Sequence, residues 1–222
     1  MIIQRLELYT NLLPEQKSFY TGLLGMPLIE EAEDSFTVLA GHTRLTFRQA
    51  NESYVYHFAF NIEENKLESA VRFVRERTRT LSDGQNEIFH FEDWNAHACY
   101  FYDAAGNIVE FIARHNLVSQ AEGAFSIQDV TGISELGMPV EDVPEIVRYC
   151  REELGLEPWR GNGTNFQPVG DEHGLFIAAS LDRSWFPTQS EAQVAPFIIT
   201  VEGSQDRRSA IPGYPYEIII ES

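Results

Sequence analysis

The chain has 222 residues, of which 43% are hydrophobic and 23% are charged, and its formal net charge is −18. This composition is typical of a soluble globular protein with one large or two small domains. The negative charge argues against nucleic acid and anionic membrane surfaces as partners, because both are polyanions. Cys99 and Cys150 form no CxxC motif, and neither a signal-like N-terminus nor a membrane-length apolar run is present, so we expect a cytoplasmic protein.

The first half of the chain predicts two units with the same order of elements, a strand, a helix and three further strands. The first unit has an alternating strand at 2–10, a helix at 13–25 and strands at 27–32, 35–40 and 43–48. Pro14 suits the first turn of that helix and Gly25 its C-terminal end. The second unit has a strand at 54–62, a helix at 64–78 and strands at 87–92, 96–102 and 107–114. Residues 116–126 are polar and small, and indicate a linker.

The second half repeats the first at an offset of 130 residues. Five identities recur in register, among them Pro14 with Pro144 and Gly25 with Gly155. The third unit is a strand at 131–140, a helix at 144–154 and strands at 157–160, 166–170 and 174–180. A shortened fourth unit keeps strands at 195–202 and 213–220. We therefore predict an α+β fold of four βαβββ units, the fourth degenerate, with one pair at 1–115 and the other at 127–222.

A hairpin at 99–112 carries the most informative motif. Its turn runs from Asp103 to Asn107, and Gly106 can adopt the positive φ that such turns require. Side chains alternate along a strand, so Glu110 shares a face with Ile108 and Ile112. A carboxylate on an apolar face needs a partner. That partner is a metal ion or an arginine, unless the face is solvated.

The four units and the motif Asp-x-x-Gly-Asn-x-x-Glu at 103–110 together resemble the vicinal oxygen chelate superfamily. This superfamily contains glyoxalase I, fosfomycin and bleomycin resistance proteins and extradiol dioxygenases. The resemblance implies paired units that form open, cupped β-barrels. Each cup would hold a divalent metal on ligands from the first and last strands of its units.

Transferred to this chain, the ligand positions of the superfamily fall on His57, Glu110 and Glu135. The equivalent positions of the first unit fall on Arg5 and near Arg44, which cannot hold a metal, because guanidinium groups stay protonated. Glu217 is expected to match Glu110 in the fourth unit, and the last strand of the third unit offers no ligand. This distribution suggests that the second and third units share one cup.

One histidine and two carboxylates favour Mn(II) over Zn(II), with Fe(II) also compatible. Within the superfamily this set is similar to that of toxoflavin lyases, which depend on Mn(II) and dioxygen and degrade a heterobicyclic azapteridine. The resemblance implies a metal-dependent dioxygenase or lyase that acts on a small planar heteroaromatic compound, and a monomer, because four units complete the fold. Two alternatives remain: a non-redox metalloenzyme of the glyoxalase or fosfomycin-resistance type, and a metal-free drug-binding resistance protein.

Residues 93–97 precede the Glu110 hairpin and are expected to face the cup. His97 and Tyr100 are candidate acid–base residues. Trp94 is a candidate stacking residue for a planar substrate, with Asn95 beside it. The alternatives are an exposed rim loop for His97 and core packing for Trp94. Residues 185–187 are expected to pack at a barrel edge.

Overall fold

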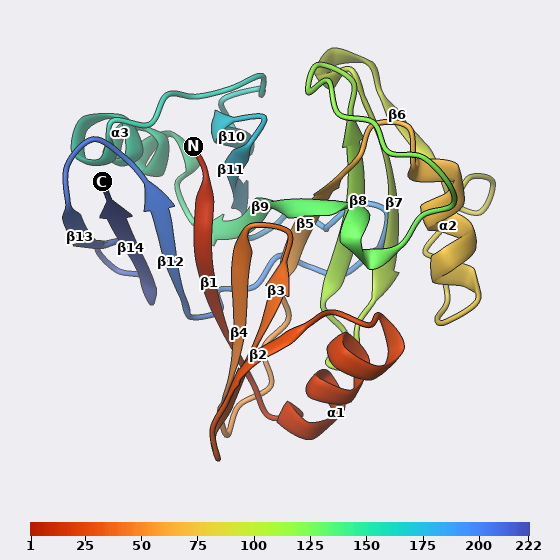
Figure 1. The fold of residues 1–222 in the computed structure, drawn as a ribbon. Helices are drawn as coiled ribbons and strands as arrows, with labels where there is room; N and C mark the ends of the chain where they lie inside the picture. The colour runs from red at the N-terminus through yellow and green to blue at the C-terminus, as the bar shows by residue number, and fades with distance from the viewer.

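The computed structural model describes residues 1–222 as two curved seven-stranded sheets that lie side by side (Figure 1). Sheet A has the order β13 (Arg207–Ala210), β14 (Tyr216–Glu221), β12 (Phe197–Glu202), β1 (Ile3–Thr10), β4 (Thr43–Gln49), β3 (Ser35–Ala40), β2 (Leu28–Glu31). Sheet B has the order β10 (Phe166–Asp171), β11 (Gly174–Ser180), β9 (Val130–Val140), β5 (His57–Ile62), β8 (Ile108–Arg114), β7 (Ala96–Tyr102), β6 (Phe89–Phe91).

The pairing of strands confirms the predicted α+β fold and shows which units share a sheet. At the centre of sheet A, β1 of the first unit is antiparallel to β12 of the fourth. At the centre of sheet B, β5 of the second unit is antiparallel to β9 of the third. The second and third units therefore share one sheet, as the ligand distribution suggested. Each sheet takes strands from both sides of residues 116–126, so the spatial pairing crosses the division expected along the sequence.

The helices confirm the internal repeat. They are α1 (Leu13–Lys17), which continues as the π-helical turn η1 (Ser18–Leu23), α2 (Leu67–Arg75) and α3 (Val143–Leu154), with short 3-10 turns η2 (Glu92–Trp94) and η3 (Ile127–Asp129). Pro14 and Pro144 both stand in the first turn of their helix. Gly25 and Gly155 follow the helices with φ of +80° and +68°. Glycine adopts this left-handed conformation without strain, which explains why it recurs at offset 130.

The structure differs from the prediction at one edge of each sheet. Residues 157–160 form no strand, only a single bridge from Pro158 to Val169, because proline cannot donate a hydrogen bond to a ladder. The edge strand β13 was not predicted. Three of its four residues are exposed, so it lacks the alternation by which buried strands are recognised.

Sheet B buries both of its faces, and this creates the setting of the site. Every residue of β5 and β8 is buried. On β8, Val109 and Phe111 join the main core, whereas Ile108 and Ile112 belong to a smaller apolar cluster on the opposite face. We refer to that opposite face as the cup of sheet B. Glu110 shares it with Ile108 and Ile112, as strand alternation predicts.

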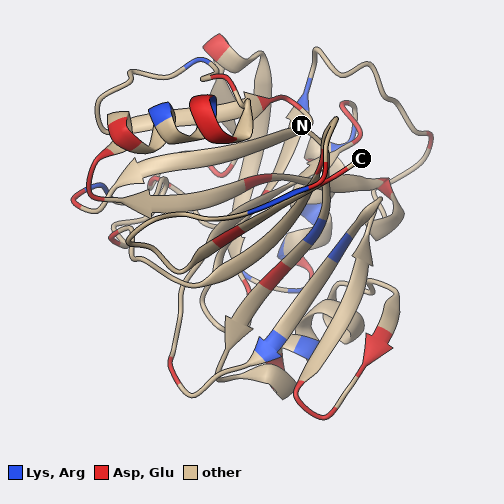
Figure 2. Ribbon diagram, turned by 90° about the vertical axis from the view of Figure 1, so that its left-hand side faces the viewer, with Lys and Arg blue, Asp and Glu red and all other residues tan.

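Charged residues are distributed unevenly over the fold. Acidic residues gather in loops and along α3, while the strands of sheet A carry residues of both signs (Figure 2). No helix is both long and apolar enough to cross a membrane.

Candidate functional site

The turn between β7 and β8 sets the register of the candidate site. Asp103 is buried, and its Oδ1 accepts a hydrogen bond from the backbone N–H of Asn107 at 2.9 Å. The Asn107 Oδ1 in turn accepts a hydrogen bond from the backbone N–H of Tyr56 at 2.8 Å, directly before β5. These contacts align β5 with β8, so that His57 pairs with Ile108. The Asp-x-x-Gly-Asn part of the motif thus positions Glu110 relative to His57.

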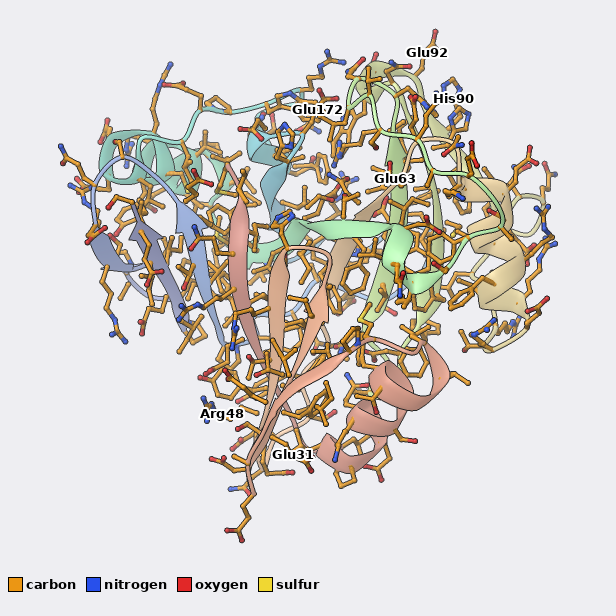
Figure 3. All side chains as sticks on the ribbon, viewed as in Figure 1. Glu31, Arg48, Glu63, His90, Glu92 and Glu172 are labelled. Carbon is orange, nitrogen blue, oxygen red and sulfur yellow. The ribbon has the colours of Figure 1, made fainter.

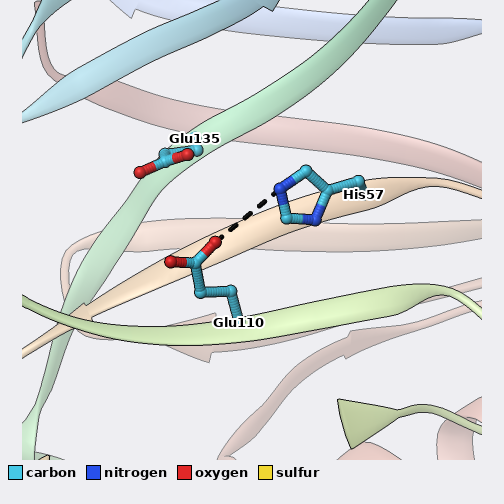
Figure 4. Close-up of side chains that lie close together, drawn as sticks. All are labelled: His57, Glu110 and Glu135. Carbon is cyan, nitrogen blue, oxygen red and sulfur yellow. Dashed lines mark ion pairs between the residues drawn. The ribbon is translucent and has the colours of Figure 1, made fainter. Parts of the chain in front are cut away.

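Three adjacent strands bring the predicted ligands together. His57 lies on β5, Glu110 on β8 and Glu135 on β9, and the register places both glutamates beside Ala59. One ligand atom from each of the three residues lies within 4.8 Å of the others (Figure 4). The structure therefore places the three predicted ligands at one point in the cup of sheet B.

The His57 ring is oriented by a backbone carbonyl. Its Nδ1 lies 3.0 Å from the Ile108 carbonyl oxygen, so Nδ1 carries the hydrogen and donates it. Nε2 then presents its lone pair, 3.7 Å from Oε2 of Glu110 (Figure 4). Burial lowers the pKa of His57 to about 4, which keeps the ring neutral at physiological pH. A neutral imidazole whose other nitrogen is hydrogen-bonded is the form that binds metals.

The two carboxylates crowd each other in a dry environment. Glu110 and Glu135 are 2% and 3% exposed. Burial, and then repulsion from Glu135, raises the pKa of Glu110 well above its ordinary value. Burial also raises the pKa of Glu135, although the Arg114 guanidinium opposes that effect. Arg114 forms an ion pair with Glu135, whereas Glu110 has no such cation partner. A divalent ion would neutralise this pair, and the donor set fits Mn(II) or another ion that accepts nitrogen and oxygen.

The metal-free protein is expected to lose stability as the pH rises above 6.5, where His57 no longer titrates and Glu110, with its raised pKa, becomes ionised. A carboxyl whose pKa is raised on folding stabilises the protonated folded state, and this contribution disappears as the pH passes the raised pKa. His57, with its pKa lowered to about 4, changes stability in the opposite direction, but only below its ordinary value of 6.5. Thermal unfolding in chelator should show a smaller pH dependence in Glu110→Gln. An equal dependence in both proteins would contradict this account.

A cavity of about 270 Å³ opens beside the three ligands. Most of its lining is aromatic or aliphatic, and the full set is His57, Phe91, Trp94, Tyr100, Glu110, Glu135, Phe166, Ile177, Arg183, Trp185, Phe186. The Trp185 ring lies 4.9 Å from the His57 ring. A Cβ on Gly137 would lie 2.8 Å from Trp185, so glycine is what allows this approach. A pocket of this size, with few polar groups, suits a small planar ligand.

The structure brings only part of the predicted constellation into the cavity. Trp94 and Tyr100 line it. His97 does not, because it lies on the other face of β7, where its Nδ1 is 2.9 Å from Nε2 of His115 and its ring stacks on His90. His90 projects outward from β6 (Figure 3). Asn95 lies in a left-handed turn, and its side chain donates a hydrogen bond to Asn116.

Several residues that line the cavity or contact its ligands were not predicted from the sequence. Arg114 follows Glu110 by four residues on the same strand, so alternation alone would have placed its buried side chain on the cup face. The loop after β11 contributes Arg183, Trp185 and Phe186, of which only the last two had been expected to pack at an edge. Nothing local in the sequence shows that this loop covers the cup.

The corresponding hollow of sheet A has no ligand set. The strand register of sheet A shows which of its residues correspond to Glu135, Ile177, His57 and Glu110 of sheet B. They are Arg5, Thr46, Ile198 and Ile219, and all four line a hollow of about 660 Å³. The sequence had predicted a position near Arg44 in place of Thr46, and Glu217 in place of Ile219, so each prediction was two residues away. Arg48, labelled in Figure 3, lines the same hollow and pairs with Glu7.

Comparison with known proteins agrees with this architecture. The model of the Glyoxalase/Bleomycin resistance protein/Dioxygenase superfamily matches residues 2–111. A protein of Bacillus subtilis subsp. subtilis str. 168, described as a presumptive dioxygenase, superposes with a TM-score of 0.63 at 13% identity and covers 99% of this chain and 85% of that chain. Glyoxalase I from Zea mays superposes with a TM-score of 0.57 at 11% identity and covers 99% and 91%. These identities establish the fold alone. No curated protein matches the sequence.

Proposed function

The chain belongs to the Glyoxalase/Bleomycin resistance protein/Dioxygenase superfamily, and from that premise we propose that it is a Mn(II)-dependent enzyme that degrades a small heteroaromatic compound with dioxygen, in the manner of toxoflavin lyases. The observation that supports this proposal is the buried group of His57, Glu110 and Glu135 beside an aromatic cavity. A bleomycin-resistance type of binding protein would have no use for a buried pair of carboxylates, which costs stability unless a cation compensates it.

Each group around the cavity has a part in this proposal. His57, Glu110 and Glu135 would hold the ion, which supplies Lewis acidity toward a chelating substrate and open positions for further ligands. Tyr100 lies against Glu110, and burial raises its pKa well above the ordinary value, so its hydroxyl stays protonated and can donate to a substrate atom. Phe91, Trp94 and other rings of the lining exclude water and present faces for stacking.

The test is loss of toxoflavin, followed by its absorbance together with an oxygen electrode, in protein supplied with Mn(II) and a reductant. We expect loss of toxoflavin and consumption of oxygen only when both metal and dioxygen are present. Metal-dependent loss without oxygen would instead indicate the non-redox, glyoxalase type of chemistry. Tight binding of toxoflavin without metal and without turnover would indicate a sequestering protein.

Glu217→Ala, which changes a glutamate of sheet A, is the matched control for general damage and should keep the full rate. A rate that falls equally in Glu217→Ala and Glu110→Ala would contradict the assignment of the reaction to the cup of sheet B.

A further inference from the structure

Arg183 is a cation in the cavity wall whose guanidinium has no hydrogen-bond or ion-pair partner within the protein. Its guanidinium carbon lies 4.3 Å from the centre of the Phe166 ring, and both residues line the cavity. The side chain is half-buried. No ion pair or hydrogen bond is made by the guanidinium group, although several other arginines of the chain pair with carboxylates. All of its N–H donors therefore remain free beside the cavity.

The other two arginines near the cavity each have an acceptor, although Nη1 of Arg114 is buried without a hydrogen-bond partner. Arg114 donates hydrogen bonds to Asn61 and Glu135. Arg160 donates to the backbone carbonyl of Asp93 and lies over the Trp159 ring. A guanidinium that loses part of its hydration without gaining an acceptor costs free energy, because charged groups need compensation when they are buried. Of the three, Arg183 alone has no acceptor for any N–H of its guanidinium, which points to an acceptor that arrives with a ligand.

The backbone holds Arg183 in place. Its N–H donates to the Ser180 carbonyl at 3.0 Å, and its own carbonyl accepts from the N–H of Ala192 at 3.0 Å. Two residues further, Trp185 N–H donates to the Ser190 carbonyl at 2.8 Å, and the Trp185 ring packs against His57. The segment that carries Arg183 is thus tied to β11 and to the candidate metal ligands. Its position in the wall is built into the fold.

We infer that the substrate carries an anionic oxygen, such as a carboxylate on its ring, which Arg183 binds while the chelating atoms of the ring face His57, Glu110 and Glu135. This inference rests on the proposed function and names, within its substrate class, planar heteroaromatic acids as the compounds that the site prefers, whereas toxoflavin is an uncharged probe of the chemistry. Guanidinium binds carboxylate oxygens through two parallel hydrogen bonds, and the Phe166 ring supports the guanidinium from one side.

The charge balance of the cavity agrees with this inference. A divalent ion would offset the two carboxylates, which leaves Arg114 and Arg183 as an excess of positive charge in the site. The chain as a whole is strongly negative and repels anions at long range. Selection of an anionic substrate must therefore come from groups inside the cavity, and Arg183 is the one that is free to contact it.

Two matched probes test the inference: lumazine, and lumazine that carries a carboxylate at ring position 7, away from its chelating O4 and N5 atoms. Binding to the Mn(II)-loaded protein is measured by calorimetry. We expect the acid to bind at least about tenfold more tightly than lumazine, as a charge-assisted, paired contact implies. In Arg183→Gln this preference should disappear, while the affinity for lumazine changes by less than about twofold. Arg183→Lys should recover part of the preference.

The Mn(II) signal in electron paramagnetic resonance separates this inference from the proposed function. Arg183→Gln should bind Mn(II) as the unmodified protein does. Failure of the unmodified protein to bind Mn(II) would overturn the proposed function itself. Normal Mn(II) binding without preference for the acid would overturn only the role of Arg183. An equal loss of affinity for both probes in Arg183→Gln would show that the side chain merely supports stacking.

Discussion

Alanine in place of His57, Glu110 or Glu135 is expected to weaken Mn(II) binding by more than about a hundredfold, because even changes to the groups that support metal ligands cost about ten- to hundredfold. Each residue supplies one ligand from a separate strand. The fourth position, on β11, is occupied by Ile177, which has no donor atom and cannot compensate. A site with three protein ligands therefore has no redundancy.

Elemental analysis after dialysis measures this directly. The unmodified protein and Glu217→Ala should keep one Mn(II) per chain, and the three ligand variants should keep almost none, with circular dichroism as the control for folding. Full retention in Glu135→Ala would remove β9 from the site. A second equivalent that persists in the ligand variants would place an ion in the hollow of sheet A, despite the arginine and the two isoleucines at its equivalent positions.

The grouping of His57, Glu110 and Glu135 could be predicted because the resemblance to the superfamily supplied the ligand positions and local, repeated features transferred them to this chain. Gly106 and Asn107 mark the hairpin, and alternation along β8 then puts Glu110 on the cup face. The offset of 130 relates Arg5 to Glu135, since both occupy the first strand of a unit. Helix boundaries followed from Pro144 and Gly155 for the same reason, as both act through their own backbone geometry.

The structure departs from the predictions where the position of a side chain depends on strand register or on segments that are distant in the sequence. His97 and Tyr100 are three residues apart on one strand, so they lie on opposite faces, and only one of them can reach the cavity. Glu217 was misplaced by two residues, because the pairing of β14 with β12 sets Ile219 at the ligand position. The loop that carries Arg183 reaches the cup only through tertiary packing. The sequence of this loop has no periodicity from which its contact with the cup could be predicted.

Replacement of Arg114 by methionine is expected to destabilise the metal-free protein by about 3–5 kcal/mol, which is the usual cost of removing one partner of a buried ion pair. The Arg114 side chain is fully buried and contacts both Glu135 and Asn61. Its loss leaves the Glu135 carboxylate without a cation and without water. Chemical denaturation in chelator measures the change, and added Mn(II) should reduce it, because the ion supplies the missing positive charge.

The pair formed by Arg48 and Glu7 is the matched control in sheet A. It is joined by two hydrogen bonds, of 3.0 and 2.8 Å, but the two side chains are 38% and 20% exposed. Arg48→Met should therefore cost less than about 1 kcal/mol. The double variant Arg114→Met with Glu135→Leu removes both charges and should regain most of the lost stability in chelator, although it cannot bind metal. If Arg114→Met proved as harmless as Arg48→Met, Glu135 would have to be neutral in the folded protein, and the charge balance assigned to the cup would be wrong.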